Sequence, residues 1–139
     1  MIPGGYEEAT ITHRNKERIY IKSRKGFIVY ALKHGYKVHP AYNFGETKAY
    51  FTFNFFEPLG LLLNKFKLPG VFALGKYFLL PIDDIEMHYV IGKGIQFPVI
   101  TKPTKEEVEK YHDIYLNELK ALYYRYNEKY DCSKHLEIY

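Results

Sequence analysis

The sequence predicts an α/β domain, in which a partial sheet is crossed by helices and closed by a long carboxy-terminal helix. An alternating strand, a glycine-terminated helix and a second extended segment follow one another in the order of a βαβ crossover. A capping box opens the last amphipathic segment. The 139 residues, 47% of them hydrophobic, are enough for one domain with its own core.

The chain opens on Pro3-Gly4-Gly5, followed by Tyr-Glu-Glu. The glycines let the backbone turn tightly and present amide protons to an anion or an acyl oxygen, although most such turns are only turns. Residues 18–22 alternate polar and apolar side chains and include β-branched residues, which predicts a short strand.

A helix is expected over residues 24–34, with Ser23 as its cap and Gly35 as its left-handed stop. One face of this helix carries its apolar side chains: Phe27, Ile28, Ala31 and Leu32. Residues 37–44 return to extended structure and are turned by Gly45-Glu46. We expect this second strand to lie parallel to the first, as in a crossover unit.

The middle of the chain predicts shorter elements. We expect a short apolar helix from residue 58 to 63 and a strand from 88 to 92. The expected turns and connector are marked by prolines and glycine: Pro69-Gly70, residues 81–84, and Pro98 to Pro103.

The last helix has the clearest pattern. Thr104 and Glu107 form a capping box, which predicts a helix from Lys105 to about Lys129. Apolar side chains recur at three- and four-residue spacing: Val108, Tyr111, Tyr115, Leu119, Leu122 and Tyr126. The tail after Tyr130 breaks this pattern and is expected to lie on the surface.

Composition excludes several classes of site. The net charge of +4 and pI near 9.0 favour phosphates, nucleotides or an anionic lipid surface without choosing among them. Cys132 is the single cysteine, so neither an internal disulfide nor a thiolate zinc cluster can form. The six histidines are scattered, and no metal site is expected.

No membrane-spanning segment is predicted. Residues 1–20 lack the apolar core of a secretory signal. The most apolar stretch, residues 50–66, is interrupted by Asn54, Glu57 and Pro58, whereas a span needs about 20 apolar residues. This stretch fits either a bilayer surface or the core.

Two motifs could bind an anion or a substrate. Arg24-Lys25-Gly26-Phe27 places two cations at a helix amino terminus, which fits a phosphate site, the alternative being two solvated cations. Phe44-Gly45-Glu46 ends a strand, where ligands gather in open α/β sheets. His34 ends its helix, where a protonated histidine interacts favourably with the negative end of the helix dipole, so a structural capping role is expected. His112 is expected to be packed or hydrogen-bonded. No nucleophile, base and oxyanion donor combine into a visible active site.

Five segments in this order resemble the carboxy-terminal half of the type-2 diacylglycerol acyltransferase family, which includes monoacylglycerol and wax-ester acyltransferases. They are PGGYEE, RKGFIVYALKHG, PAYNFGE, VIGKGIQFP and KPTKEEVEKYHDIYLNELKALY. The resemblance covers nearly the whole chain, so residues 1–139 are expected to be the carboxy-terminal portion of an acyltransferase domain. It implies an α/β fold like that of related glycerolipid acyltransferases.

The resemblance also implies a reaction, the transfer of a fatty acyl group from acyl-CoA to diacylglycerol in triacylglycerol synthesis. It implies a location on the cytosolic face of the endoplasmic reticulum membrane or on a lipid droplet. The family's general base is thought to be a histidine in a His-Pro-His-Gly motif, which is absent here. His39-Pro40 lacks the flanking His-Gly, so no catalytic residue and no cofactor are assigned; acyl-CoA is the co-substrate.

The substrate-binding residues implied by the resemblance come from three motifs. They are Gly4, Gly5, Glu8, Arg24, Lys25, Gly26, Phe27, Phe44, Gly45 and Glu46. The chain departs from the family at three places: a histidine interrupts the usually apolar strand at residue 39, and Glu86 and Gly94 stand where proline is common.

The expected partners are acyl-CoA, a glycerolipid acceptor and a membrane surface, and a homo-oligomer is compatible with the sequence. One alternative is a non-catalytic remnant that binds lipid or acyl-CoA. A nucleic-acid binder is disfavoured, because the aromatic residues gather in apolar blocks rather than between arginines. A partial sheet exposes an edge and an apolar face, so we expect poor solubility of the chain alone.

Overall fold

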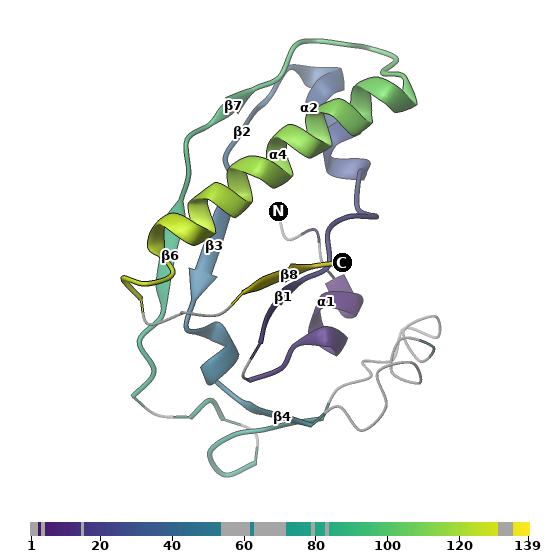
Figure 1. Ribbon diagram of the computed structural model, residues 1–139. Helices are drawn as coiled ribbons and strands as arrows, with labels where there is room; N and C mark the ends of the chain where they lie inside the picture. Colours follow the sequence, from purple (N-terminus) through teal and green to yellow (C-terminus); the bar gives the residue numbers. More distant parts are fainter. Residues whose placement is uncertain are drawn as a thin grey trace.

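The computed structural model describes residues 3, 5–14, 16–53, 62, 72–78, 80–82, 84–130 and 135–139. In this part of the chain, two helices pack against a long antiparallel ribbon, and two further two-stranded sheets lie beyond it (Figure 1). The helix expected at 58–63, apart from Leu62, the Pro69-Gly70 turn and Asp83 of the turn at 81–84 lie outside the described residues. The overall class, mixed helix and strand, is as predicted.

The ribbon is built from two pairs of antiparallel strands. β3 (Ala41–Phe44) pairs with β6 (His88–Ile91), and β2 (Lys37–Val38) pairs with β7 (Ile95–Gln96). The single strand expected from 37 to 44 is therefore two strands, because Pro40 between them has no amide proton to donate to a ladder. The strand expected near 88–92 is confirmed.

The expected crossover of two parallel strands is not confirmed, because the first two strands do not share a sheet. β1 (Glu17–Ile19) pairs in parallel with β8 (Leu136–Ile138), while β3 takes β6 as its neighbour. A strand's own pattern does not say which distant segment supplies its hydrogen bonds. The tail was expected on the surface, yet Leu136 in β8 is only 4% exposed.

The helix α2 (Gly26–His34) begins later than predicted. Lys25 is its N-cap and no side chain caps it, so the expected cap at Ser23 is wrong; Ser23 lies in an exposed turn. Its end is confirmed: Gly35 has φ 63° and ψ 38°, and the chain closes onto the carbonyls of Ala31 and Leu32.

The helix α4 (Lys105–Tyr126) confirms the capping box. The Glu107 amide donates to Thr104 Oγ1 at 3.2 Å, and the Thr104 amide donates to Glu107 Oε2 at 2.8 Å. Four of the six predicted stripe residues are buried, namely Val108, Tyr115, Leu119 and Leu122, and the other two, Tyr111 and Tyr126, are partly buried. The helix ends at Tyr126, before the expected Lys129.

The core lies where α2 and α4 meet the ribbon. Ile28 and Leu32 of α2 are fully buried, and Phe44 of β3 stacks on Tyr123 of α4 with ring centroids 5.6 Å apart. Figure 1 shows α4 running the length of the ribbon, across β2, β7, β3 and β6. This packing fixes α2 relative to β2 on one side of α4.

The remaining elements lie at the other end of the molecule. The helix α1 (Gly5–Ile11) was not predicted and starts directly at the opening glycines. The turn η1 (Glu46–Lys48) leads into β4 (Phe51–Phe53), which pairs antiparallel with β5 (Phe72–Leu74).

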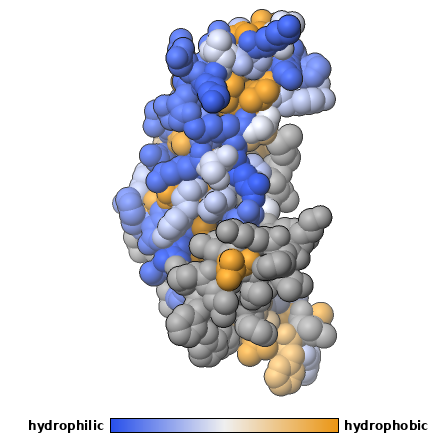
Figure 2. Space-filling model, turned by 90° about the vertical axis from the view of Figure 1, so that its right-hand side faces the viewer, coloured by the Kyte–Doolittle hydropathy of each residue, from blue (hydrophilic) through white to orange (hydrophobic). Residues whose placement is uncertain are grey.

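The loop after β5 exposes large apolar side chains. Tyr77 and Phe78 are about three-quarters exposed, and Figure 2 shows apolar colour at this lower end of the molecule. Phe51, from the apolar stretch expected at a bilayer surface or in the core, is half exposed under the guanidinium of Arg14. No helix in the described part of the chain has both the length and the apolar character needed to cross a membrane.

Candidate functional site

The opening glycine motif lies against the start of α2. Gly5 has φ 67° and begins α1, and a Cβ built on it would lie 3.7 Å from Arg24 Nη2. Arg24 Nη2 donates to Glu7 of α1. The first two sequence motifs are therefore joined by an ion pair; Gly4 lies outside the described residues.

Lys25 is held in the same way from another direction. Its ammonium donates to Glu109 of α4 and lowers the pKa of that carboxyl. Both cations of the predicted phosphate site thus have carboxylate partners, and their role in substrate binding stays a prediction. A Cβ added to Gly26 would meet no atom within 4 Å, so crowding does not require glycine there.

Phe27 packs onto α4. Its ring centroid lies 5.0 Å from that of Tyr115 and 6.2 Å from that of His112. His112 is 2% exposed, and its Nε2 lies 3.1 Å from the Ile21 carbonyl oxygen, to which it donates. Burial lowers the pKa of His112. The expected packed and hydrogen-bonded state of His112 is confirmed.

The Phe44-Gly45-Glu46 motif has one residue in the core and one in solvent. Phe44 is fully buried, whereas Gly45 has φ 90°, and a Cβ added to it would overlap the Glu86 carbonyl oxygen. Glycine is required at 45 for both reasons. Glu46 is exposed and accepts a hydrogen bond of 3.1 Å from Asn43 Nδ2. Contact of this motif with a substrate stays a prediction.

Glu8 connects the first and third motifs electrostatically. Burial raises the pKa of Glu8, the nearby charge of Glu46 raises it further, and a hydrogen bond with the Tyr20 backbone opposes both. The pKa of Tyr115 is raised by burial and, to a smaller extent, by the neighbouring Tyr89 and Glu8. The charge of Glu8 thus interacts with Glu46 and with Tyr115, which come from two other segments of the chain.

Glu17 is a structural residue that sequence reasoning missed. It is 2% exposed and accepts hydrogen bonds from the Tyr42 hydroxyl at 2.7 Å and from Thr47 Oγ1 at 2.8 Å. These bonds tie β1 to β3 and η1, so they set the position of the Gly45 turn. The signal in the sequence was strand alternation, which places Glu17 on the same face as the buried Ile19 and Ile21.

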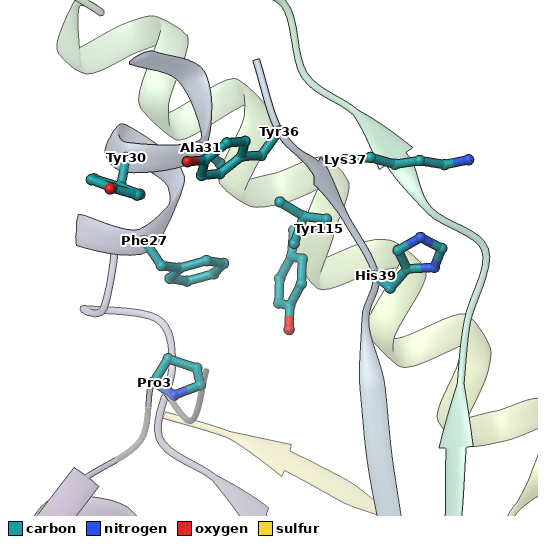
Figure 3. A pocket seen from close by; sticks show the side chains of 9 residues that line it. Pro3, Phe27, Tyr30, Ala31, Tyr36, Lys37, His39 and Tyr115 are labelled. Carbon is teal, nitrogen blue, oxygen red and sulfur yellow. The ribbon is translucent and has the colours of Figure 1, made fainter. Parts of the chain in front are cut away.

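A pocket of about 410 Å³ lies between α2, β2 and α4. Its walls are mainly aromatic and aliphatic: Pro3, Phe27, Tyr30, Tyr36, Val38 and Tyr115. Figure 3 shows Phe27 and Tyr115 pointing into the space between α2 and β2, with Pro3 at one end. Of the predicted site residues, Phe27 lines this pocket.

A second pocket, of about 400 Å³, lies beside the Gly45 turn and is lined by Glu46, by Ala9 of α1 and by Thr12 just after α1. Of the predicted site residues, Phe27 thus lines the first pocket and Glu46 the second, and neither lining includes the others. Among the described residues, no three His, Cys, Asp or Glu side chains come together as a metal site.

The family model described as "Diacylglycerol acyltransferase" matches residues 1–139. The chain belongs to the diacylglycerol acyltransferase family. The resemblance found in the sequence motifs is thereby confirmed. No solved structure matches the chain significantly.

Curated relatives of this family member carry several acyltransferase names. Mouse diacylglycerol O-acyltransferase 2-like protein 6 is 30% identical over 99% of this chain and 45% of its own length. Mouse 2-acylglycerol O-acyltransferase 1 is 32% identical over 97% of this chain and 44% of its own length. Diacylglycerol O-acyltransferase 2 of Xenopus tropicalis is 31% identical over 91% of this chain and 38% of its own length. The chain thus spans less than half the length of each.

Proposed function

We propose that this chain contributes the acyl-CoA-binding part of an O-acyltransferase that esterifies a glycerolipid, with diacylglycerol as the acceptor. The observation that carries the proposal is the family match over residues 1–139, supported by relatives named as diacylglycerol and 2-acylglycerol O-acyltransferases. The aromatic pocket between α2, β2 and α4 supports it further, because apolar walls of this kind suit an acyl chain.

The proposed reaction needs a base and a thioester binding site. A base removes the proton of the acceptor hydroxyl, the oxygen attacks the thioester carbonyl carbon, and the carbon–sulfur bond breaks to release the CoA thiolate. The sequence contains no His-Pro-His-Gly motif. We assign substrate binding to the residues of this chain, with Phe27 and Tyr115 as walls of the acyl site, because both line the pocket.

A second candidate is binding of acyl-CoA or lipid without turnover, which the mainly apolar lining of the pocket supports. The purified chain is incubated with radiolabelled palmitoyl-CoA and diacylglycerol, and labelled triacylglycerol is measured. Binding without product is the result expected of the chain alone. Product formation would overturn the assignment of binding without catalysis to this chain.

The acyl pocket has its own test. Phe27→Ala removes one aromatic wall beside Tyr115, and we expect palmitoyl-CoA to bind about tenfold more weakly, while CoA without an acyl chain binds as before. Tyr77→Ala, in the exposed loop after β5, is the matched control. Equal loss of both ligands in Phe27→Ala would count against the pocket as an acyl site.

We also propose that the protein works at the cytosolic face of the endoplasmic reticulum membrane or on a lipid droplet, since its proposed acceptor dissolves only in lipid. The half-exposed and exposed apolar side chains around β4 and β5 support contact with a lipid surface. Cell fractionation of the tagged chain should recover it with microsomes or floating droplets. Recovery only in the supernatant would contradict this location.

A further inference from the structure

Two basic side chains, Lys37 in β2 and His39 just after β2, lie against Gly94, which directly precedes β7. A Cβ built on Gly94 would lie 2.5 Å from Lys37 Cε and 2.6 Å from His39 Nε2. Only the absence of a side chain at Gly94 lets both groups close over the same spot. Figure 3 shows the two side chains projecting from β2 toward β7, on the side of the strand away from Phe27 and Tyr115.

The ring of His39 is oriented by the backbone. Its Nδ1 lies 3.0 Å from the Gly92 carbonyl oxygen, and a carbonyl oxygen only accepts, so Nδ1 donates. The other nitrogen, Nε2, lies against Gly94, as does Lys37 Cε. When both ring nitrogens carry a proton, Nε2 can donate a hydrogen bond to the oxygen of an anion.

No carboxylate neutralises this pair within the part of the chain that the structure describes. Residues 26–45 and 87–105, which form α2, the ribbon and the connector to α4, contain no Asp or Glu. They carry lysines instead: Lys33, Lys37, Lys93, Lys102 and Lys105. Within the described residues, neither Lys37 nor His39 has a salt bridge, whereas Arg24 and Lys25 both do. Positive charge without a carboxylate partner attracts anions, so Lys37 is a better anion site than Arg24 or Lys25.

The basic pair also borders the apolar pocket. Lys37 and His39 line its edge, with Val38 between them, so β2 separates a basic face from an aromatic hollow. A ligand that fits both has a phosphate at one end and a long apolar arm at the other. We propose that Lys37 and His39 bind a phosphate group of acyl-CoA, whose acyl arm crosses β2 into the pocket. This inference rests on the proposed function.

The test measures binding of inorganic phosphate, CoA and palmitoyl-CoA to the full chain by calorimetry. The double variant with Lys37→Ala and His39→Ala should lower the affinity for CoA about tenfold or more and abolish measurable phosphate binding, because charge-assisted hydrogen bonds are lost. Lys37→Arg should retain CoA binding. Lys120→Ala, an exposed lysine of α4, is the matched control and should change nothing.

Gly94→Ala provides a second variant that removes no charge. Its Cβ would displace Lys37 and His39, so CoA affinity should fall as in the double variant. Thermal unfolding of each variant is measured to test whether the fold is kept. Unchanged CoA and phosphate affinities in both folded variants would overturn the site.

The outcomes separate this site from the proposed function. If the unmodified chain binds inorganic phosphate, the double variant does not, and palmitoyl-CoA binds neither, the proposed function fails and so does the acyl-CoA assignment, while Lys37 and His39 remain a phosphate site. If palmitoyl-CoA binds the double variant normally, the site fails and the function stands. Vesicles of phosphatidylcholine with phosphatidic acid form the last arm: loss of vesicle binding with unchanged CoA affinity would assign the phosphate to a lipid headgroup and overturn the acyl-CoA assignment.

Discussion

The two ends of α2 carry similar positive charge and differ in what surrounds it. At the amino end, Arg24 and Lys25 are paired with Glu7 of α1 and Glu109 of α4. At the carboxy end, Lys37 follows Gly35 and closes with His39 on Gly94, in segments without a carboxylate. Because α1 and α4 bring acids to one end only, the amino end is held structurally and the carboxy end is open to an anion.

This difference changes which motif is the stronger candidate for phosphate. From sequence, the helix amino terminus with two cations fits best. In the structure, an anion at Arg24 or Lys25 would compete with a carboxylate already in place, whereas at Lys37 it would not. Four predictions test the contrast, from the largest expected effect to the smallest.

Leu32→Ala should remove the packing that supports both ends. Leu32 is a fully buried core residue of α2, so its truncation leaves a cavity and should lower the free energy of unfolding by about 2–5 kcal/mol. Urea unfolding measures it. The exposed neighbour Lys33→Ala is the control, with an expected change within about 0.5 kcal/mol. A loss at Leu32 no larger than at Lys33 would contradict the packing described.

Gly35→Ala should affect only the carboxy end of α2. Its φ of 63° is strained for alanine, and the new Cβ would lie 2.6 Å from Val99 Cγ2, so the unfolding free energy should fall by about 1–3 kcal/mol. CoA affinity should fall with it, since Lys37 shifts. Gly26→Ala at the amino end has open space and is the matched control, for which no destabilisation is expected. Equal losses of unfolding free energy in Gly26→Ala and Gly35→Ala would contradict the difference between the two ends of α2.

His112 should make the amino end sensitive to acid. Its folded pKa lies below the ordinary 6.5, so the unfolded chain binds the proton more readily and stability is lost as pH falls from 6.5 through the lowered folded value. His112→Gln keeps a donor for the Ile21 carbonyl and removes the titration. Unfolding at several pH values on both sides of the ordinary pKa should show a steeper decline for the unmodified chain. Parallel curves would refute the role of burial at this histidine.

Arg24→Ala should lower the free energy of unfolding least of the four. Its pair with Glu7 is partly exposed, so the loss should be about 1 kcal/mol or less and should shrink at high salt. Lys37→Ala has no ion pair to lose among the described residues, and its unfolding free energy should be salt-independent within error. A salt-dependent loss in Lys37→Ala equal to that in Arg24→Ala would show that both ends are paired in solution.

Much of the local structure was readable from the sequence. The capping box at Thr104, the left-handed stop at Gly35 and the strand near residue 90 depend on neighbouring residues, and the structure confirms all three. The cap at Ser23 failed because the turn before α2 places Lys25 at that position. Of the site, Phe27 beside the pocket was predictable from its motif, whereas Glu17 and the Lys37–His39 pair were not.

The sequence by itself determined the family, the mixed helix-and-strand class and the ends of the two principal helices to within a few residues, because motifs and caps are encoded locally. Only the tertiary structure decided which strands pair, which charges are neutralised and where the hollows lie. The parallel partner of β1 comes from residues 136–138, and the partner of Lys25 from residue 109. Such contacts depend on the energy of packing distant segments together, and local sequence patterns do not indicate which segments these are.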